Sequence, residues 1–240
     1  MGRQSGTPGQ RALSDQRRRD PVWASGPLTQ VSWIDGRPVA WYVRLDGDDA
    51  HRDAGRAVLS AQEKAAFART GDAPWRIMRR LLAKALIARA AMCHPDDVRI
   101  ERDALGALRL VKPIGWHLSL AGQPPQALIG LHRLAIGVDI EPGNAPPPLE
   151  DAFSAEDLVV LAKLWPGNPD RARLIGWVAK EAHGKACGRA RQLDPRDIWL
   201  NRRAGSLFAT SHGTSTVVHI AVDIETIAAV AVEKPSSKSA

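Results

Sequence analysis

The chain has 240 residues, 44% hydrophobic content and a formal net charge of +7, so it is neither fibrous nor wholly disordered and can bury a sizeable core. Two widely separated cysteines, Cys93 and Cys187, exclude a disulfide framework and a clustered-cysteine zinc site, which favours a reducing cytosol. No segment approaches the roughly 18 consecutive apolar residues of a membrane span, and the N-terminus has no apolar signal region, so we expect a soluble protein that is not exported.

Much of the net charge lies at the two ends of the chain. Residues 1–20 carry a net +3 and residues 233–240 a net +1, which leaves +3 for the body. The ends are rich in Gly, Ser, Gln and Pro, so residues 1–22 and 234–240 are predicted to be disordered tails. No RNA-binding or zinc-finger signature accompanies the charge, and the mildly basic body favours anionic substrates or acidic partners over duplex nucleic acid.

Residues 23–134 are predicted to form an N-terminal α+β half. Alternating apolar residues at 31–45, with a turn at Gly36, predict a first strand region. Ser60 and Glu63 have the spacing of a capping box, which predicts the start of a short helix. The half should therefore begin with strand structure that leads into helices.

A longer helix is predicted over residues 75–92, and its sequence separates two faces. Arg76, Arg80 and Lys84 recur at i, i+4 and i+8, beside an apolar face. Taken alone, such a basic stripe is most simply a solvated surface. A run of strands broken by Gly, Pro and polar turns then follows. These strands are predicted at residues 98–101, 108–111, 116–120, 127–131 and 134–141.

Residues 135–233 are predicted to form a C-terminal α+β half. A proline-rich loop follows its first strand, Ser154 is placed to cap the next helix, and another helix covers residues 171–188. The order strand, helices, strands, helices, strands predicts an α+β protein in which each half is an antiparallel sheet packed on helices. The halves could resemble each other, joined near residues 132–136, although no clear sequence repeat proves a duplication. The closing strands are predicted at residues 198–200, 207–209, 217–222 and 227–232.

Two carboxylates interrupt the apolar strand IGVDIE at residues 136–141. Side chains alternate along a strand, so its Ile and Val residues share one face, and Asp139 and Glu141 share the other with Gly137. Two carboxylates about 7 Å apart on one face repel each other unless water, a base or a cation separates them. The strand is therefore predicted to have a dry side and an anionic side.

The helix sequence WVAKEAHGKACG, residues 177–188, carries a second set of charges. Helical spacing places Trp177, Glu181 and Lys185 on one stripe, with Lys180 adjacent. Alone, the Glu181–Lys185 pair would most simply be an exposed salt bridge that contributes about 0.3–0.5 kcal/mol. Combined with the acids of the strand, it gives three carboxylates and a lysine, a set suited to Mg²⁺ and phosphate chemistry.

In this order and spacing, IGVDIE and WVAKEAHGK resemble the two signature motifs of the 4′-phosphopantetheinyl transferases of the surfactin-synthetase-activating (Sfp-like) type. The similarity extends from about residue 40 to residue 233. It implies a pseudo-twofold α+β protein that binds coenzyme A between its halves and, at this chain length, a monomer; the cysteine usage adds the expectation that it is cytoplasmic. The implied reaction transfers 4′-phosphopantetheine from coenzyme A to a serine of an apo acyl or peptidyl carrier protein, leaving 3′,5′-ADP.

The resemblance also implies roles for individual residues. Asp139, Glu141 and Glu181 match the acids that hold Mg²⁺ on the pyrophosphate of coenzyme A, and Glu181 also matches the proposed catalytic base. Lys185 matches a catalytic lysine that contacts phosphate. Carrier proteins are typically acidic around the modified serine, so the mildly basic body suits such a partner. The positions matched to coenzyme A binding are Lys64, Arg76, Ser119, Lys180 and Lys185.

The sequence departs from the family pattern in the segment HLSLAG, residues 117–122. Ser119 matches the first serine of the family's Ser-His-Ser motif, but Leu120 replaces the histidine that binds the 3′-phosphate and Ala121 replaces the second serine. The upstream Gly-Lys-Pro turn is also altered, since Ala107 stands in place of its lysine. Losing two charge-assisted contacts at about 1.5–3 kcal/mol each would weaken coenzyme A binding by orders of magnitude.

Three hypotheses follow from this departure. Arg109, His117 or an arginine of the basic stripe compensates for the loss; the donor lacks the 3′-phosphate; or the chain has no transferase activity and is an interaction module that binds carrier proteins or nucleotides. Nucleic-acid binding through the arginine-rich tail is a further hypothesis, which predicts steeply salt-dependent binding. Fatty-acid, polyketide and nonribosomal-peptide carriers all fit the resemblance.

Overall fold

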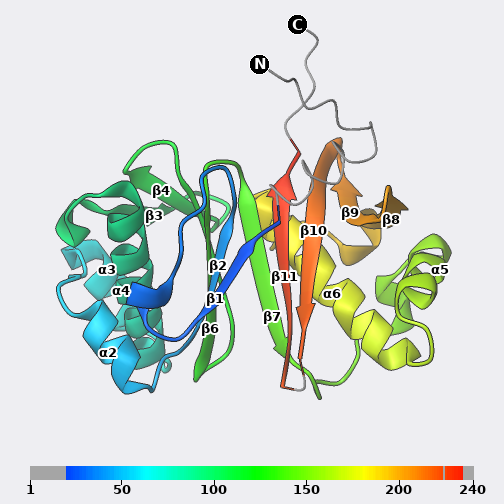
Figure 1. Cartoon of the computed structure of the whole chain (residues 1–240), viewed down its shortest axis with the longest axis horizontal. Coiled ribbons are helices and arrows are strands. Elements are labelled where there is room, and N and C mark those ends of the chain that lie inside the picture. Colours follow the sequence, from blue (N-terminus) through cyan, green and yellow to red (C-terminus); the bar gives the residue numbers. More distant parts are fainter. Residues whose placement is uncertain (1–19, 224, 235–240) are drawn as a thin grey trace, which may run out of the picture.

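Two β-sheets lie side by side in the structure, a computed structural model that describes residues 20–223 and 225–234, and helices flank them (Figure 1). The chain is therefore a mixed α+β protein, as the order of elements predicted. The predicted tails fall almost wholly outside the described residues. No helix among the described residues has both the length and the apolar character needed to cross a bilayer.

The N-terminal sheet has the strand order β1 (Val22–Ser25), β2 (Val39–Arg44), β6 (Gln126–His132) and β5 (His117–Ala121). β1 pairs with β2 in parallel, whereas the other neighbours are antiparallel. The expectation of a purely antiparallel sheet is thus wrong at this edge. The sequence gives little sign of β1, because four residues are too few for a periodic pattern.

β2 begins later than the alternation of apolar residues predicted, because the preceding segment turns. Leu28–Gln30 form a 3₁₀ turn (η1), and Gly36 has a φ of +73°. Pro38 then has no amide hydrogen to donate to a neighbouring strand. The regular strand can start only after this proline, at Val39.

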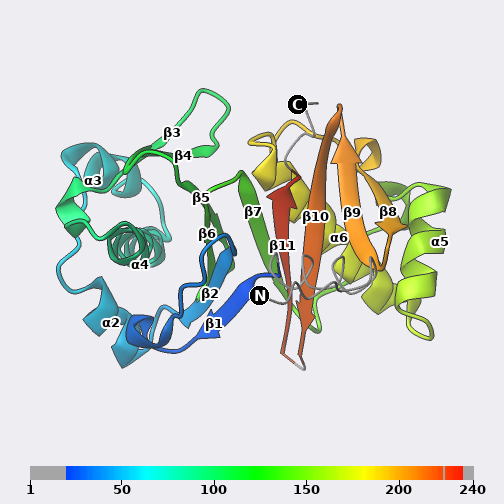
Figure 2. The ribbon, with the colours of Figure 1, turned by 45° about the horizontal axis from the view of Figure 1, so that its top comes forward.

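Three helices and a hairpin complete the N-terminal half. Their bounds are α2 (Asp48–Ala54), α3 (Ala61–Phe67), α4 (Ala73–Ala91), β3 (Arg99–Arg102) and β4 (Leu108–Lys112). The predicted capping box is confirmed, since Ser60 and Glu63 exchange hydrogen bonds at the start of α3. Among the described strands, β3 and β4 pair only with each other. The hairpin extends toward the C-terminal half (Figure 2), where Arg191 lies against its turn at Gly106.

The basic stripe of α4 is not a solvated surface. Arg80 and Lys84 expose only 5% and 3% of their surface, and Lys84 Nζ lies 2.9 Å from Glu63 Oε2. Arg80 Nε lies 3.5 Å from the other oxygen of Glu63, whereas Arg76 pairs with Asp72 nearer the surface. The solvated interpretation is wrong for Arg80 and Lys84 because α3 packs on this face of α4 and supplies the counter-charge.

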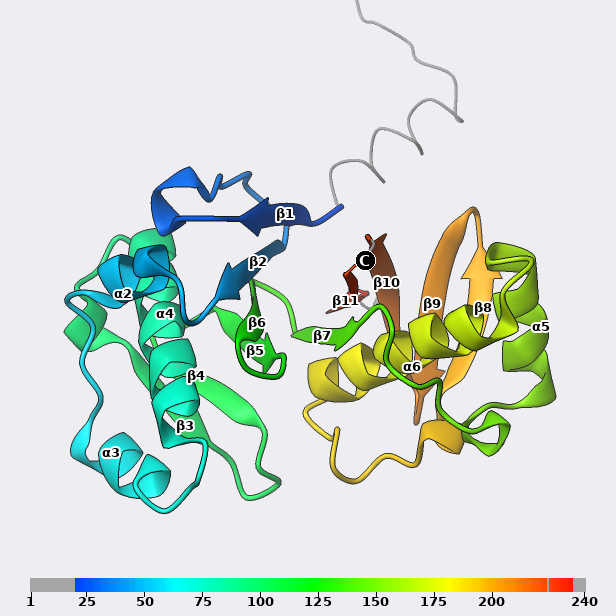
Figure 3. The same ribbon diagram turned by 90° about the horizontal axis from the view of Figure 1, so that it is seen from below.

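The C-terminal half contains a five-stranded antiparallel sheet and two helices. In chain order they are β7 (Ile136–Pro142), α5 (Ala155–Leu164), α6 (Pro169–Ala186), β8 (Trp199–Arg203), β9 (Ser206–Ser211), β10 (Thr214–Val222) and β11 (Thr226–Glu233). The strand order in the sheet is β7-β11-β10-β9-β8, and α6 crosses one face of it (Figure 3). As with β2 and β6, the first long strand pairs antiparallel with the last. The helices and strands predicted for this half are confirmed.

A buried lysine–carboxylate pair beside a capping box occurs in both halves. In the C-terminal half, Lys180 Nζ lies 2.7 Å from Asp157 Oδ2, and Asp157 closes a capping box with Ser154. This repeats the arrangement of Lys84 and Glu63. In each half the lysine also donates to the carbonyl oxygen two residues before the capping serine, at 2.8 Å in the first half and 3.0 Å in the second.

A short sequence repeat accompanies this structural similarity. The segments HPDDVRIER (residues 94–102) and DPRDIWLNR (residues 194–202) share Pro, Asp and Arg and two apolar positions. In each segment the proline begins a 3₁₀ turn, η2 (Pro95–Asp97) or η4 (Pro195–Asp197), and the strand β3 or β8 follows. The repeat is hard to detect in the sequence because identity is confined to those three residue types.

The dry side of β7 joins the two halves. Ile136, Val138 and Ile140 are buried in one cluster with Leu128 of the N-terminal sheet. The predicted apolar face of this strand is therefore confirmed. A polar contact adds to the junction, because Ser119 Oγ on β5 accepts a hydrogen bond from the amide of Val138 at 3.0 Å.

Replacing Gly137 of β7 with alanine is expected to destabilise the protein. A Cβ atom there would overlap the carbonyl of Ala182 and the amide of Ala186 in α6, and backbone atoms cannot move aside as a flexible side chain can. We expect urea denaturation to show that the free energy of unfolding falls by about 1–3 kcal/mol or more. Gly71→Ala is the matched control, since nothing lies within 4 Å of a Cβ built there. Equal stability of the two variants would contradict the packing of α6 on β7.

Removing the carboxylate of Asp157 is expected to cost about 3–5 kcal/mol of stability, because it leaves Lys180 buried without a counter-charge. The same carboxylate also accepts a hydrogen bond from the amide of Leu200 at 2.6 Å. The control is Asp170→Ala, which breaks a more exposed pair with Arg173 and should change stability by less than about 1 kcal/mol. Similar denaturation midpoints for Asp157→Ala and the control would refute this structural role.

Candidate functional site

The anionic face of β7 meets α6. Gly137 lies on this face, and its lack of a side chain lets the backbone of α6 approach the strand closely. Asp139 and Glu141 follow on the same face because side chains alternate along a strand. The predicted anionic side of β7 is thus directed at the helix that carries Glu181 and Lys185.

Asp139 and Lys185 form the central ion pair of the site. Lys185 Nζ donates to Asp139 Oδ1 at 2.6 Å, and only 5% of the surface of Asp139 is exposed. The other carboxylate oxygen, Oδ2, is buried and has no hydrogen-bond partner. Burial raises the pKa of Asp139 above its usual range, and the nearby Lys185 ammonium opposes that rise. One oxygen of this acid is therefore paired, and the other is desolvated without compensation.

Glu181 and Glu141 lie within the electrostatic reach of this pair. Burial raises the pKa of Glu181, and repulsion from Asp139 adds to the rise. The pKa of Glu141 is raised for the same two reasons, in the same order. Asp139 thus raises the cost of ionising both glutamates, and the Lys185 ammonium lowers that cost for all three acids. The group as a whole would be stabilised by additional positive charge.

The metal site implied by the resemblance is not formed in this structure. Among residues 20–223 and 225–234, no three His, Cys, Asp or Glu side chains are arranged so that they could hold a metal ion. Asp139 binds Lys185 instead. The donors nevertheless fit a hard cation, because Asp139, Glu141 and Glu181 are all carboxylates and Asp139 Oδ2 lacks a hydrogen-bond partner.

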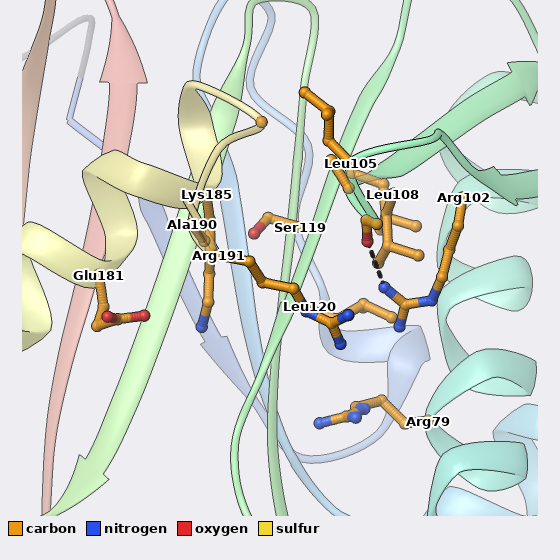
Figure 4. A pocket seen from close by; sticks show the side chains of 14 residues that line it. Arg79, Arg102, Leu105, Leu108, Ser119, Leu120, Glu181, Lys185, Ala190 and Arg191 are labelled. Carbon is orange, nitrogen blue, oxygen red and sulfur yellow. Dashed lines mark hydrogen bonds between the residues drawn. The ribbon is translucent and has the colours of Figure 1, made fainter. Parts of the chain in front are cut away.

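A cavity of about 290 Å³ opens between the two halves beside this ion pair (Figure 4). Glu181 and Lys185 of α6 line one side of it, and the β3–β4 hairpin lines the other. β5 contributes Ser119 and Leu120 to its wall, and the loop after α6 contributes Arg191. The cavity therefore joins the carboxylates of the C-terminal half to residues of the N-terminal half.

Of the residues predicted to bind coenzyme A, Ser119 and Lys185 line this cavity. Lys180 does not lie with them, and its match to a coenzyme A ligand has no support from this arrangement. Its ammonium group has three donors, and they are directed to Asp157, Ala152 O and Pro195 O at 2.7–3.0 Å. With 1% of its surface exposed, Lys180 has no free donor for a substrate.

The structure does not bring Lys64 and Arg76 to the cavity wall. Lys64 lies on α3 with an exposed side chain. Arg76 is half-buried at the start of α4, and its Nε lies 2.6 Å from Asp72 Oδ1. These two matches to coenzyme A ligands remain predictions from the resemblance, without support from this arrangement.

Three other arginines line the cavity, and sequence reasoning missed them. Arg79 projects from α4, Arg102 from the end of β3 and Arg191 from the loop after α6 (Figure 4). Arg79 lies next to the predicted basic stripe, so a stripe shifted by one residue would have included it. Arg102 ends the repeated HPDDVRIER segment. Arg191 lies in an irregular loop, where no spacing rule predicts the direction of a side chain.

A second cavity of about 450 Å³ adjoins the first, and the residues that line both are Ala107, Leu108, Leu118, Lys185 and Gly188. Arg109 and His117, the residues considered as replacements for the missing histidine, line this second cavity and not the one that contains Leu120. Arg109 also pairs with Asp103 at 2.9 Å. Burial lowers the pKa of His117, which disfavours the charged imidazolium that would bind phosphate best.

Comparison with known proteins places a family match on the half of the chain that carries the acids. No curated protein matches the sequence. The matched segment covers less than half of the chain, and it contains Asp139, Glu141, Glu181 and Lys185. It begins just before β7 and ends within β11. The finding is that residues 135–232 match the family model described as the 4′-phosphopantetheinyl transferase superfamily.

Proposed function

We propose that the protein transfers the 4′-phosphopantetheine group from coenzyme A to a serine of an apo carrier protein. One observation carries the proposal: within the segment that matches the transferase superfamily, Glu181 and Lys185 of α6 line a cavity between the halves, and Lys185 binds Asp139 of β7 beside it. In the proposed reaction, the serine oxygen forms a bond to the β-phosphorus of coenzyme A. The bond from that phosphorus to the bridging oxygen breaks, and 3′,5′-ADP leaves.

The residues of this chain supply a base and a positive charge. Glu181 accepts the proton of the serine hydroxyl, directly or through a water molecule, and its raised pKa makes it a stronger base than an ordinary carboxylate. Lys185, whose side chain is partly exposed to the cavity, donates to phosphate oxygens as negative charge develops on the leaving group. Ser119 lines the same wall and can donate its hydroxyl hydrogen, because its oxygen is the acceptor in the bond from Val138.

Asp139, Glu141 and Glu181 are the residues that would hold Mg²⁺. The ion would neutralise the charge of the pyrophosphate when bound. Asp139 Oδ2 and the two glutamates offer the oxygen ligands that this ion prefers.

We further propose that the halves form a pseudo-twofold pair with the donor between them, as in the Sfp-like type. The repeated lysine–carboxylate pairs, the capping boxes and the segments at residues 94–102 and 194–202 support this interpretation. In both halves the first long strand also pairs antiparallel with the last.

A non-catalytic role in binding carrier proteins or nucleotides is the alternative. Leu120 favours it, because an apolar side chain lines the cavity at the position that matches a phosphate-binding histidine. The two proposals differ in whether a carrier protein gains mass.

Incubation of the protein with coenzyme A, Mg²⁺ and apo carrier proteins is expected to add one phosphopantetheine to the carrier, as intact-mass spectrometry would detect. Glu181→Gln should reduce the rate by at least about 100-fold, because it removes both the base and a metal ligand. Glu150→Gln is the matched control, since Glu150 pairs with Arg173 and does not line the cavity. No mass gain on fatty-acid, polyketide or nonribosomal-peptide carriers at saturating coenzyme A would refute the transferase and leave the binding module.

Mg²⁺ is expected to raise the thermal midpoint of unfolding by an increment that grows with pH. Because the folded pKa values of the three acids are raised, the metal-free protein loses stability as pH rises through them. Mg²⁺ binds the ionised acids, so it should offset that loss over the same pH window. Thermal melts with and without millimolar Mg²⁺, for the wild type and Asp139→Asn, measure the increment. An increment that is independent of pH, or unchanged in Asp139→Asn, would contradict this site.

A further inference from the structure

Arginine side chains gather at the end of the cavity that contains Leu120. Arg79, Arg102 and Arg191, here called the basic wall, come from α4, β3 and the loop after α6, and Figure 4 shows their guanidinium groups directed toward a common region beside Leu120. Arg191 also lies against the β3–β4 turn, with Nη1 3.3 Å from a Cβ built on Gly106. Three segments that are distant in sequence thus place positive charge at one end of the cavity.

The charge of the basic wall is not neutralised by the described part of the protein. No carboxylate of residues 20–223 and 225–234 lies within 4.0 Å of these three guanidinium groups. Arg79 donates to the carbonyl of Gly122 at 3.0 Å and Arg102 to that of Gly106 at 2.6 Å. Each guanidinium has five donor hydrogens, so most of them are left for a ligand.

Nearby acids are already occupied by other cations. Glu63 is shared by Lys84 and Arg80, and Asp72 is bound by Arg76. Burial lowers the pKa values of Arg79 and Arg102, and repulsion from neighbouring arginines lowers them further. Like charges held together without a counter-charge are stabilised by an anion that binds between them.

The two ends of the cavity differ in charge: one carries an acid and a lysine, and the other carries three arginines. Glu181 and Lys185 lie on one wall, and the basic wall lies across from them (Figure 4). A ligand with a pyrophosphate near Lys185 and a second phosphate some distance away would match both ends. Guanidinium groups suit such a second phosphate, because their planar donors bind phosphate oxygens in pairs.

We infer that Arg79, Arg102 and Arg191 bind a phosphate monoester on the nucleotide end of the donor, and so replace the histidine that Leu120 displaces. This inference rests on the proposed function for the identity of the donor, in which the monoester is the 3′-phosphate of coenzyme A. Arg109 and His117 do not take this role, because they line the adjoining cavity. The three arginines thus supply the positively charged phosphate contact that the motif lacks at Leu120.

Calorimetric titration of the full chain in EDTA with 3′,5′-ADP and with 5′-AMP tests the inference without carrier protein or metal. The wild type is expected to bind 3′,5′-ADP at least about tenfold more tightly than 5′-AMP. Arg191→Gln and Arg102→Gln should each reduce that ratio several-fold, because both side chains are accessible at the rim and leave the core intact. Arg99→Gln is the matched control, since Arg99 lies on the same hairpin outside the cavity and should keep the ratio. Thermal midpoints equal to the wild type show that the variants are folded.

The outcomes separate this inference from the transferase proposal. If the wild type prefers 3′,5′-ADP to 5′-AMP and the arginine variants lose that preference, the basic wall binds the phosphate monoester. This result would hold even if no carrier protein is modified. Equal binding of the two nucleotides by the wild type overturns the inference, and so does a ratio unchanged in both arginine variants. Transfer from 3′-dephospho-coenzyme A as fast as from coenzyme A would also overturn it while leaving the transferase in place.

Discussion

The close packing of α6 against β7 determines the positions of the charged groups in the candidate site. Gly137 allows the two backbones to approach, and two residues further along the strand Asp139 accepts a hydrogen bond from Lys185 at 2.6 Å. The same packing removes water from the acids, which raises their pKa values and leaves Asp139 Oδ2 without a partner. The geometry that assembles the acids therefore also makes their ionised forms unfavourable without added positive charge, which is the physical basis of the proposed cation site.

Charged residues of the same type serve two different purposes in this protein. Lys180 and Lys185 lie five residues apart on α6, which turns them by roughly 140° from each other around the helix. Lys180 is held by Asp157 in the interior, whereas Lys185 reaches the cavity. A similar separation occurs on α4, where Arg80 is buried beside Glu63 and its neighbour Arg79 lines the cavity. The buried pairs join α4 to α3 and α6 to α5, and Arg79 and Lys185 on the same helices reach the cavity.

Much of the fold was predictable because its signals are local. Alternation gave the two faces of β7, and the Ser60 and Ser154 capping boxes marked two helix starts. The parallel strand β1 and the burial of the basic stripe depend on contacts between distant segments, which periodicity does not describe. The acidic strand and Lys185 could be selected because their spacing is a local signal, whereas the burial of Lys180 beside Asp157 depends on a segment distant in sequence. Arg191 could not be selected at all, because the direction of a loop side chain is set by tertiary packing.

The cavity has two ends, with Glu181 and Lys185 at one and the basic wall at the other. The central claim is that one donor molecule spans both ends, with its pyrophosphate beside Asp139 and Glu181. The most direct measurement is a crystal structure of the protein with coenzyme A and Mn²⁺, in which anomalous scattering locates the metal. The account predicts a metal peak bound by Asp139 and Glu181 and a 3′-phosphate in contact with Arg102 or Arg191. A metal peak away from these acids, or coenzyme A bound outside this cavity, would contradict it.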